Sequence, residues 1–164
     1  MCLLEASIVA IYHAAPSNLQ VIDDLQLRFL RALNLPEEAA FLEFNLAPLQ
    51  LRRDIAVLGL LHKIQLGEAH QDFELLFPKM VGSHVGNTRR NARRHGKQFW
   101  EQDGNTDYFN RSVFGALRVY NLLPEYVVNS NCVQQFQTLL TKDARFQCRH
   151  GNPAWARIYT TGLR

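Results

Sequence analysis

The chain has 164 residues, 18 of them Lys or Arg and 15 Asp or Glu, and 47% of its residues are hydrophobic. This length fits one ordinary domain with a substantial core, and the composition argues against disorder as the overall state. Three cysteines without a signal-peptide pattern argue against a disulfide scaffold and favour an intracellular protein, nuclear or cytoplasmic. No apolar run approaches the roughly 20 residues of a membrane span, so we expect no membrane contact.

Three helices are predicted in the first part of the chain. Residues 18–33 repeat apolar side chains at steps of three and four, and Ser17 before them is a good capping residue. A short second helix follows Pro36, because Pro and an acidic pair suit a helix start. The third helix opens at Pro48 and ends at Gly67, a residue suited to a left-handed cap.

The third helix carries the strongest pattern, and its residues 57–61 are apolar on nearly all sides. A helix of this kind is either central in a bundle or covered by a partner that the chain lacks. Both alternatives stay open at the level of sequence.

A short fourth helix is predicted over residues 69–76, before Pro78. Residues 81–107 lack apolar periodicity and contain several glycines, which predicts a loop with a short extended piece near residues 97–100. A fifth helix begins at Thr106 or Asp107 and stops at Pro124, and a last one is capped by Ser130 and ends near Gly151. Residues 155–164 have no clear pattern.

These elements predict an all-α fold, an irregular bundle of five to six helices with a long basic loop in the middle. The expected organisation is an N-terminal helical part over residues 1–78, a Gly- and Arg-containing loop over residues 79–106, and a C-terminal helical part over residues 107–164.

The charge is distributed unevenly. The basic segment, residues 79–97, contains six cationic residues and no acidic one, which leaves 12 basic against 15 acidic residues in the rest of the chain. Guanidinium groups bind phosphate oxygens, and the aromatic pair that follows offers a face on which a base can stack. The residues predicted to contact nucleic acid are Lys79, Arg89, Arg90, Arg93, Arg94, Lys97 and Trp100.

Basic clusters of this length are also common as solvated loops or import-like patches. The sequence leaves these readings open beside contact with RNA or DNA.

Catalytic and metal signatures are weak. Asp23 and Asp24 superficially resemble the paired carboxylates of polymerases, but we expect them in the first turns of a helix, where they favour the helix dipole. Cys132, Cys148 and His150 lack the two close ligand pairs of a structural zinc site, so we expect no metal. His62 is expected to be a half-exposed structural histidine. Nucleotide-loop and hydrolase motifs are absent, so we expect no cofactor and no enzymatic activity.

Three stretches together resemble the region that follows the palm in reverse transcriptases of non-LTR, LINE-like retrotransposons. They are residues 10–14 with 25–30, residues 45–49 with 52–63, and residues 111–124 continuing to Leu140. The last is similar to the family's "W-N-x-L-P … F-K-x-x-L" ending, with Tyr120 where Trp is usual. The resemblance covers residues 8–142 and rests on helical motifs rather than catalytic ones.

The resemblance implies a thumb or post-palm fragment without the palm carboxylates, which therefore does not polymerise alone. It also implies that the helices pack behind a primer–template duplex, with the basic loop near phosphates. The first expected function is accordingly a non-catalytic remnant of an RNA-directed DNA polymerase that contacts nucleic acid. The alternative is a protein-interaction module that associates with itself or another polypeptide through the apolar helix from Ile55 to Ile64.

Overall fold

The computed structural model describes residues 11–80, 95–101, 104 and 106–160. Within these residues it contains eight α-helices, one 3-10 helix and no strand beyond an isolated bridge, which confirms the predicted all-α fold. The helix count exceeds the predicted five to six because two short helices were not anticipated. The helices are α3 (Pro16–Ala32), α4 (Glu37–Phe44), α5 (Leu49–Gln65), α6 (Gln71–Leu76), α7 (Asp107–Asn110), α8 (Val113–Asn121), α9 (Glu125–Val128), α10 (Val133–Arg149) and the 3-10 helix η1 (Trp155–Arg157).

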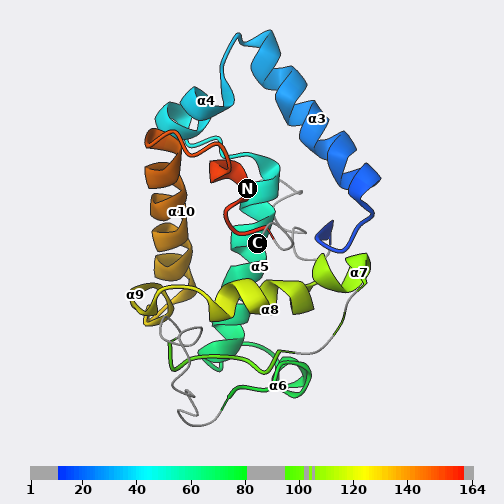
Figure 1. The fold of residues 1–164 in the computed structure, drawn as a ribbon, viewed down its shortest axis with the longest axis vertical. Helices are drawn as coiled ribbons and strands as arrows, with labels where there is room; N and C mark the ends of the chain where they lie inside the picture. Colours follow the sequence, from blue (N-terminus) through cyan, green and yellow to red (C-terminus); the bar gives the residue numbers. More distant parts are fainter. Residues whose placement is uncertain (1–10, 81–94, 102–103, 105, 161–164) are drawn as a thin grey trace.

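Helix α5 lies at the centre of the molecule, with α10 beside it and α8 crossing it (Figure 1). Its side chains are buried on several faces, including Leu51, Val57, Leu58, Leu61 and Ile64. This result decides between the two sequence-level alternatives, because α5 is covered by the chain's own helices. The proposed interaction surface from Ile55 to Ile64 is therefore wrong, since those apolar side chains already form the core.

The end of α5 follows the predicted glycine cap. Gly67 has a φ of 75°, and the amide of Glu68 donates to the Lys63 carbonyl. Glycine adopts this left-handed conformation without the steric strain that a side chain brings, which favours the end of the helix at this position.

The predicted fifth helix is divided into α7 and α8. The hydroxyl of Ser112 donates to the Phe109 carbonyl and accepts from the Phe114 amide, so it ends one helix and caps the next. A side chain at Gly115 would meet the Asn110 carbonyl oxygen, which shows how closely the two segments approach. Helix α9 then begins after Pro124, where the sequence predicted only a stop.

Helix α10 buries Phe136, Leu140 and Ala144, which follow one another at steps of four, in the core. Its start differs from the prediction by two residues, because Cys132 rather than Ser130 is the N-cap and its sulfur accepts from the Gln135 amide. The segment after α10, which had no clear pattern, turns back over the bundle. There Trp155 stacks on Phe41 with ring centroids 5.2 Å apart.

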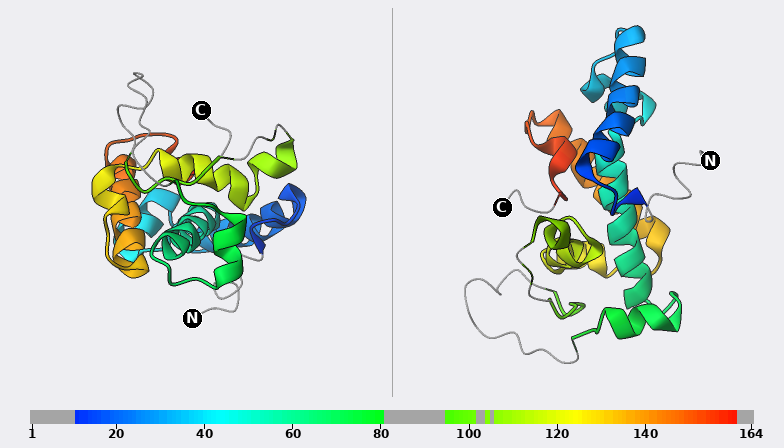
Figure 2. Two further views of the ribbon diagram at one scale, coloured as in Figure 1. Left: turned by 90° about the horizontal axis from the view of Figure 1, so that it is seen from below. Right: turned by 90° about the vertical axis from the view of Figure 1, so that its right-hand side faces the viewer.

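Helix α3 lies at the outside of the molecule, inclined to α5 and joined to it along one face (Figures 1 and 2). Core residues come from both predicted helical parts, from Tyr12 to Tyr159, so the two parts share one hydrophobic core. Within the described part of the chain, none of the helices combines the length and hydropathy of a membrane span.

Candidate nucleic-acid interface

The structure describes three of the seven predicted contact residues: Lys79, Lys97 and Trp100. The other four, Arg89, Arg90, Arg93 and Arg94, lie outside the described residues. The geometry of the site therefore concerns the two ends of the basic segment and the helices that hold them.

The two ends of the basic segment are joined by an antiparallel bridge between Lys79 and Phe99. The Met80 amide donates to the Gln98 carbonyl at 2.8 Å, and the Trp100 amide donates to the Pro78 carbonyl at 3.0 Å. This pairing confirms the short extended piece expected near residues 97–100. It brings residues 79 and 99, which are 20 positions apart in the sequence, side by side.

Helix α8 holds the second end through Asn121. The Phe99 amide donates to Asn121 Oδ1 at 3.0 Å, and Asn121 Nδ2 donates to the Phe99 carbonyl at 2.9 Å. The same Nδ2 donates to Glu101 Oε1 at 3.0 Å. One buried amide side chain thus satisfies both backbone groups of a buried residue, as a neighbouring strand would.

His95 fixes the chain a few residues earlier. Its Nε2 donates to the Tyr120 carbonyl at 3.0 Å, while Nδ1 accepts from the Lys97 amide at 3.1 Å. Because a carbonyl only accepts and an amide only donates, these partners select the neutral tautomer with the proton on Nε2. Burial lowers the pKa of His95 in agreement with this assignment.

The two described lysines of the segment have partners within the chain. Lys79 Nζ lies 3.0 Å from Glu74 Oε1, and Lys97 Nζ donates to the Val128 carbonyl at the end of α9 at 3.2 Å. Trp100, in contrast, is 57% exposed, whereas its neighbour Phe99 is fully buried. Phe99 is therefore the anchor and Trp100 the aromatic face that can reach a ligand.

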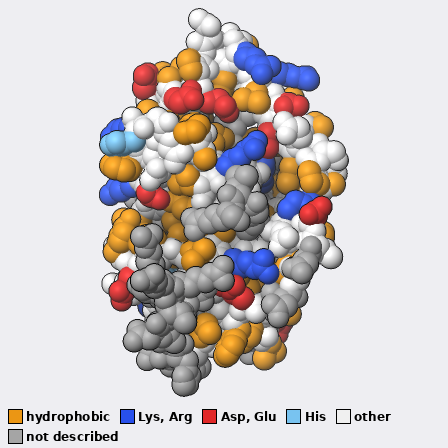
Figure 3. All heavy atoms as spheres, viewed as in Figure 1, with side chains coloured by type: hydrophobic (Ala, Val, Ile, Leu, Met, Phe, Trp, Pro, Cys, Tyr) orange, Lys and Arg blue, Asp and Glu red, His pale blue; other side chains and the backbone are white. Residues whose placement is uncertain are grey.

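Charge elsewhere on the described surface is mixed. On the face shown in Figure 3, the coloured Lys and Arg side chains are separated by acidic and apolar ones and form no continuous basic area. The basic segment is accordingly the main concentration of positive charge that the sequence and this face provide.

His62 and Tyr120 form a buried polar pair next to His95, which binds the Tyr120 carbonyl. His62 Nδ1 is 3.0 Å from the Tyr120 hydroxyl, Nε2 is 3.1 Å from the Ser130 carbonyl, and the ring stacks on Phe136 at 4.2 Å. Since Ser130 accepts, Nε2 carries the proton and the Tyr120 hydroxyl donates to Nδ1. Burial lowers the pKa of His62. The expectation of a half-exposed His62 is wrong, because the side chain is fully buried.

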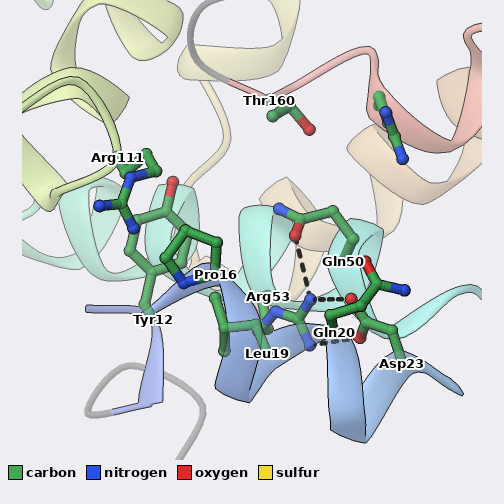
Figure 4. Close-up of a pocket in the computed structure, with 10 residues that line it drawn as sticks. Tyr12, Pro16, Leu19, Gln20, Asp23, Gln50, Arg53, Arg111 and Thr160 are labelled. Atoms are coloured by element: carbon green, nitrogen blue, oxygen red, sulfur yellow. Dashed lines mark hydrogen bonds and ion pairs between the residues drawn. The ribbon is translucent and has the colours of Figure 1, made fainter. Parts of the chain in front are cut away.

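A cavity of about 340 Å³ between α3, α5 and the C-terminal segment was not predicted from the sequence. Figure 4 shows Arg111 and Tyr12 at one end of it, and Asp23 paired with Arg53 at the other. Three arginines and one aspartate line it, so the charge of the lining favours anions. Its lining residues are Tyr12, Pro16, Leu19, Gln20, Asp23, Gln50, Arg53, Arg111, Arg157 and Thr160.

The role expected for Asp23 and Asp24 is also corrected here. Helix α3 begins at Pro16, so both residues lie beyond its first turn and do not act on the helix N-terminus. Asp23 instead accepts two hydrogen bonds of 2.7 Å from the Arg53 guanidinium. This ion pair joins residues 30 positions apart, and no local pattern reports it.

No group of three or more His, Cys, Asp or Glu side chains suited to a metal ion occurs among residues 11–80, 95–101 and 106–160. Asp54, which follows Arg53 in the sequence, is buried, and this burial raises its pKa to about 6, although hydrogen bonds from Thr160 and Gln50 oppose the shift.

Comparison of the chain with protein-family models, curated proteins and solved structures found no match.

Proposed function

We propose that this chain is a non-catalytic helical module that contacts nucleic-acid phosphates through the basic segment at residues 79–97. The observation that carries the proposal is the way both ends of that segment are held on the bundle. The Lys79–Phe99 bridge closes it, and Asn121 fixes the side that leads to Trp100. The two ends of a segment with six cations and no acid are thus fixed on the helical bundle.

Electrostatics supports a polyanion as the ligand. Arg89, Arg90, Arg93 and Arg94 supply planar guanidinium groups, which suit bidentate contacts with phosphate oxygens. Lys79 and Lys97 have partners inside the chain, so their side chains hold the ends of the segment and contribute less to ligand binding. We therefore expect the four arginines to provide most of the binding energy.

Trp100 favours a nucleic acid over other polyanions. Its side chain is exposed beside the closing bridge, and an indole face can stack on a base that has left its duplex. The resemblance to non-LTR reverse transcriptases points to the same ligand class and supports the proposal of a polymerase-derived origin.

The test is a fluorescence-anisotropy titration with a labelled RNA/DNA hybrid and a labelled single strand at two salt concentrations. Affinity should fall steeply with salt, because each neutralised phosphate releases a counterion. Changing Arg89, Arg90, Arg93 and Arg94 to Ala should abolish most of the binding and reduce the salt slope.

The matched control changes four exposed cations on other elements to Ala, namely Arg28, Lys63, Lys142 and Arg149, none of which lines the cavity beside Arg53. It lowers the net charge by the same amount, so any effect of overall charge is equal in the two proteins. If both variants lose affinity equally, or if binding does not depend on salt, the basic segment is not the binding site.

Trp100→Leu tests the stacking contribution. It should weaken single-strand binding by about 5- to 150-fold, the range expected for loss of one base–aromatic stack. Tyr126→Leu, at an exposed aromatic residue on α9, is the control. Equal effects of the two substitutions would remove Trp100 from the site.

A further inference from the structure

A row of large apolar side chains on α3 is exposed to solvent. Val21, Leu25, Phe29 and the C-cap residue Leu33 are 62%, 59%, 56% and 57% exposed. They follow one another at steps of four, so they form a single ridge along the helix. A contiguous apolar ridge of this kind on a surface usually marks a binding site.

The opposite face of α3 is already occupied by contacts within the chain. Asp23 binds Arg53, and Gln26 donates to the Ala47 carbonyl at 3.0 Å and accepts from the Leu49 amide at 2.9 Å. Leu30 on this face is buried. The helix cannot turn its apolar ridge inward without breaking these bonds, so the ridge stays outside. Figure 1 and the left view of Figure 2 place α3 at the edge of the molecule.

The charged residues beside the ridge change sign along α3. Asp24 lies in the N-terminal half of α3, and the exposed Arg28 and Arg31 lie in the C-terminal half. All three fall on the same side of the ridge by the 100° step of an α-helix. One half of the helix is therefore acidic and the other basic along the same edge.

This arrangement is self-complementary under a two-fold axis. If two α3 helices cross antiparallel with the axis midway between Leu25 and Phe29, each Leu25 meets the Phe29 of the other copy. The same axis brings Asp24 of one copy to the level of Arg31 of the other, within about one residue rise of 1.5 Å. A parallel pair would instead put the two charged edges on opposite sides of the contact, so Asp24 would have no Arg31 to face.

We propose that the partner of this ridge is a second copy of the chain, bound through an antiparallel α3–α3 contact. Symmetric homodimers need a surface patch that is complementary to itself, and the ridge with its acidic and basic halves meets that requirement. Rows of residues at steps of four also pack into one another in the commonest class of helix crossing. The contact does not involve the basic segment, so the test of this proposal is separate from the test of the proposed function.

The first experiment measures the mass of the purified chain by light scattering over a range of concentrations without nucleic acid. We expect reversible association to a dimer, and Phe29→Glu should abolish it by placing charge at the centre of the contact. Leu75→Glu on α6 is the matched control, because Leu75 is 82% exposed but lies away from the ridge. A chain that stays monomeric at all concentrations, or a dimer that survives Phe29→Glu, overturns the proposal.

A charge-reversal experiment tests the antiparallel register. Asp24→Arg alone and Arg31→Glu alone should each weaken self-association, because each puts like charges together at both ends of the contact. Mixing the two single variants should restore dimers, since each introduced charge then faces its opposite. Circular dichroism melts verify that both variants remain folded. Loss of association without recovery on mixing would reject this register.

Discussion

Asn121 pairs with Phe99 through both of its amide atoms, accepting from the Phe99 N–H at 3.0 Å and donating to the Phe99 carbonyl at 2.9 Å. Residues 98 and 100 are hydrogen-bonded to residues 80 and 78, and a side chain of α8 takes the place of a second neighbouring strand for Phe99. This pairing joins the helical bundle to the base of the basic segment, so its loss should affect stability and binding together.

Asn121→Leu should lower the free energy of unfolding by about 2–4 kcal/mol, because two buried backbone groups of Phe99 lose their partners. The exposed Asn129 at the end of α9 gives the control Asn129→Leu, for which we expect a change within about 0.5 kcal/mol. Urea unfolding measures both. Hydrogen exchange of the Phe99 amide should accelerate in the first variant only, and unchanged exchange would show that Asn121 does not hold this segment.

Tyr120→Phe should destabilise the protein by about 1–3 kcal/mol. The substitution removes the hydroxyl that donates to His62 Nδ1 and leaves this buried nitrogen without a partner. Tyr126→Phe, at an exposed tyrosine of α9, should have almost no effect. Thermal unfolding followed by circular dichroism compares the two, and equal melting temperatures would mean that water or a shifted ring satisfies His62.

Asp54→Asn should change the pH dependence of stability. Burial raises the pKa of Asp54 to about 6, above the value near 4 in the unfolded chain. The folded state therefore holds a proton that the unfolded state releases, and the stability from this group is present below about pH 4 and lost as the pH rises through 6. An amide cannot ionise, so the variant escapes that loss.

Relative to the parent chain, the Asp54→Asn variant should gain on the order of 3 kcal/mol between pH 4 and pH 7. His62 has a lowered pKa, and its contribution is lost in the opposite direction, as the pH falls below 6.5. That effect is common to both proteins and cancels in the difference. Urea unfolding at several pH values measures the difference in stability between the variant and the parent chain. Glu43→Gln, on the exposed side of α4, is the control. A difference that does not vary with pH would contradict the prediction.

Trp155→Ala should cost about 3–5 kcal/mol, because the indole is buried and stacks on Phe41. The control is Trp100→Ala, which removes the chain's other tryptophan from an exposed position and should leave stability within about 0.5 kcal/mol. Unfolding is followed by circular dichroism, since each variant changes the fluorescence. A change within about 0.5 kcal/mol for Trp155→Ala as well would show that the C-terminal segment adds little to the core.

The long helices could be predicted because their information is local. Helix α5 follows its apolar pattern from Pro48 to the left-handed Gly67, and α10 follows the stripe of Phe136, Leu140 and Ala144. The division of α7 from α8 was missed because it depends on one serine. The Ser112 hydroxyl bonds the backbone on both sides of the break, whereas the apolar spacing continues through it.

The candidate site was only partly predictable. The sequence identified the basic segment and Trp100, but not Asn121 and His95, which hold its end. Polar residues in a helix or loop are usually solvated, so nothing local distinguished Asn121 as buried. The Arg53–Asp23 pair and the adjacent cavity were missed for the same reason, since both depend on how α3 is placed against α5.

By itself, the sequence determined the helical class, the main helix boundaries and the concentration of cations between residues 79 and 97, because periodicity, caps and charge act over a few neighbouring residues. Only the tertiary structure decided that α5 is buried by the chain itself and that the exposed apolar ridge lies on α3. Burial depends on which elements meet in space. Hydrogen bonds such as Gln26 to Ala47 and Leu49 set the rotation of α3, and with it the side that remains in water.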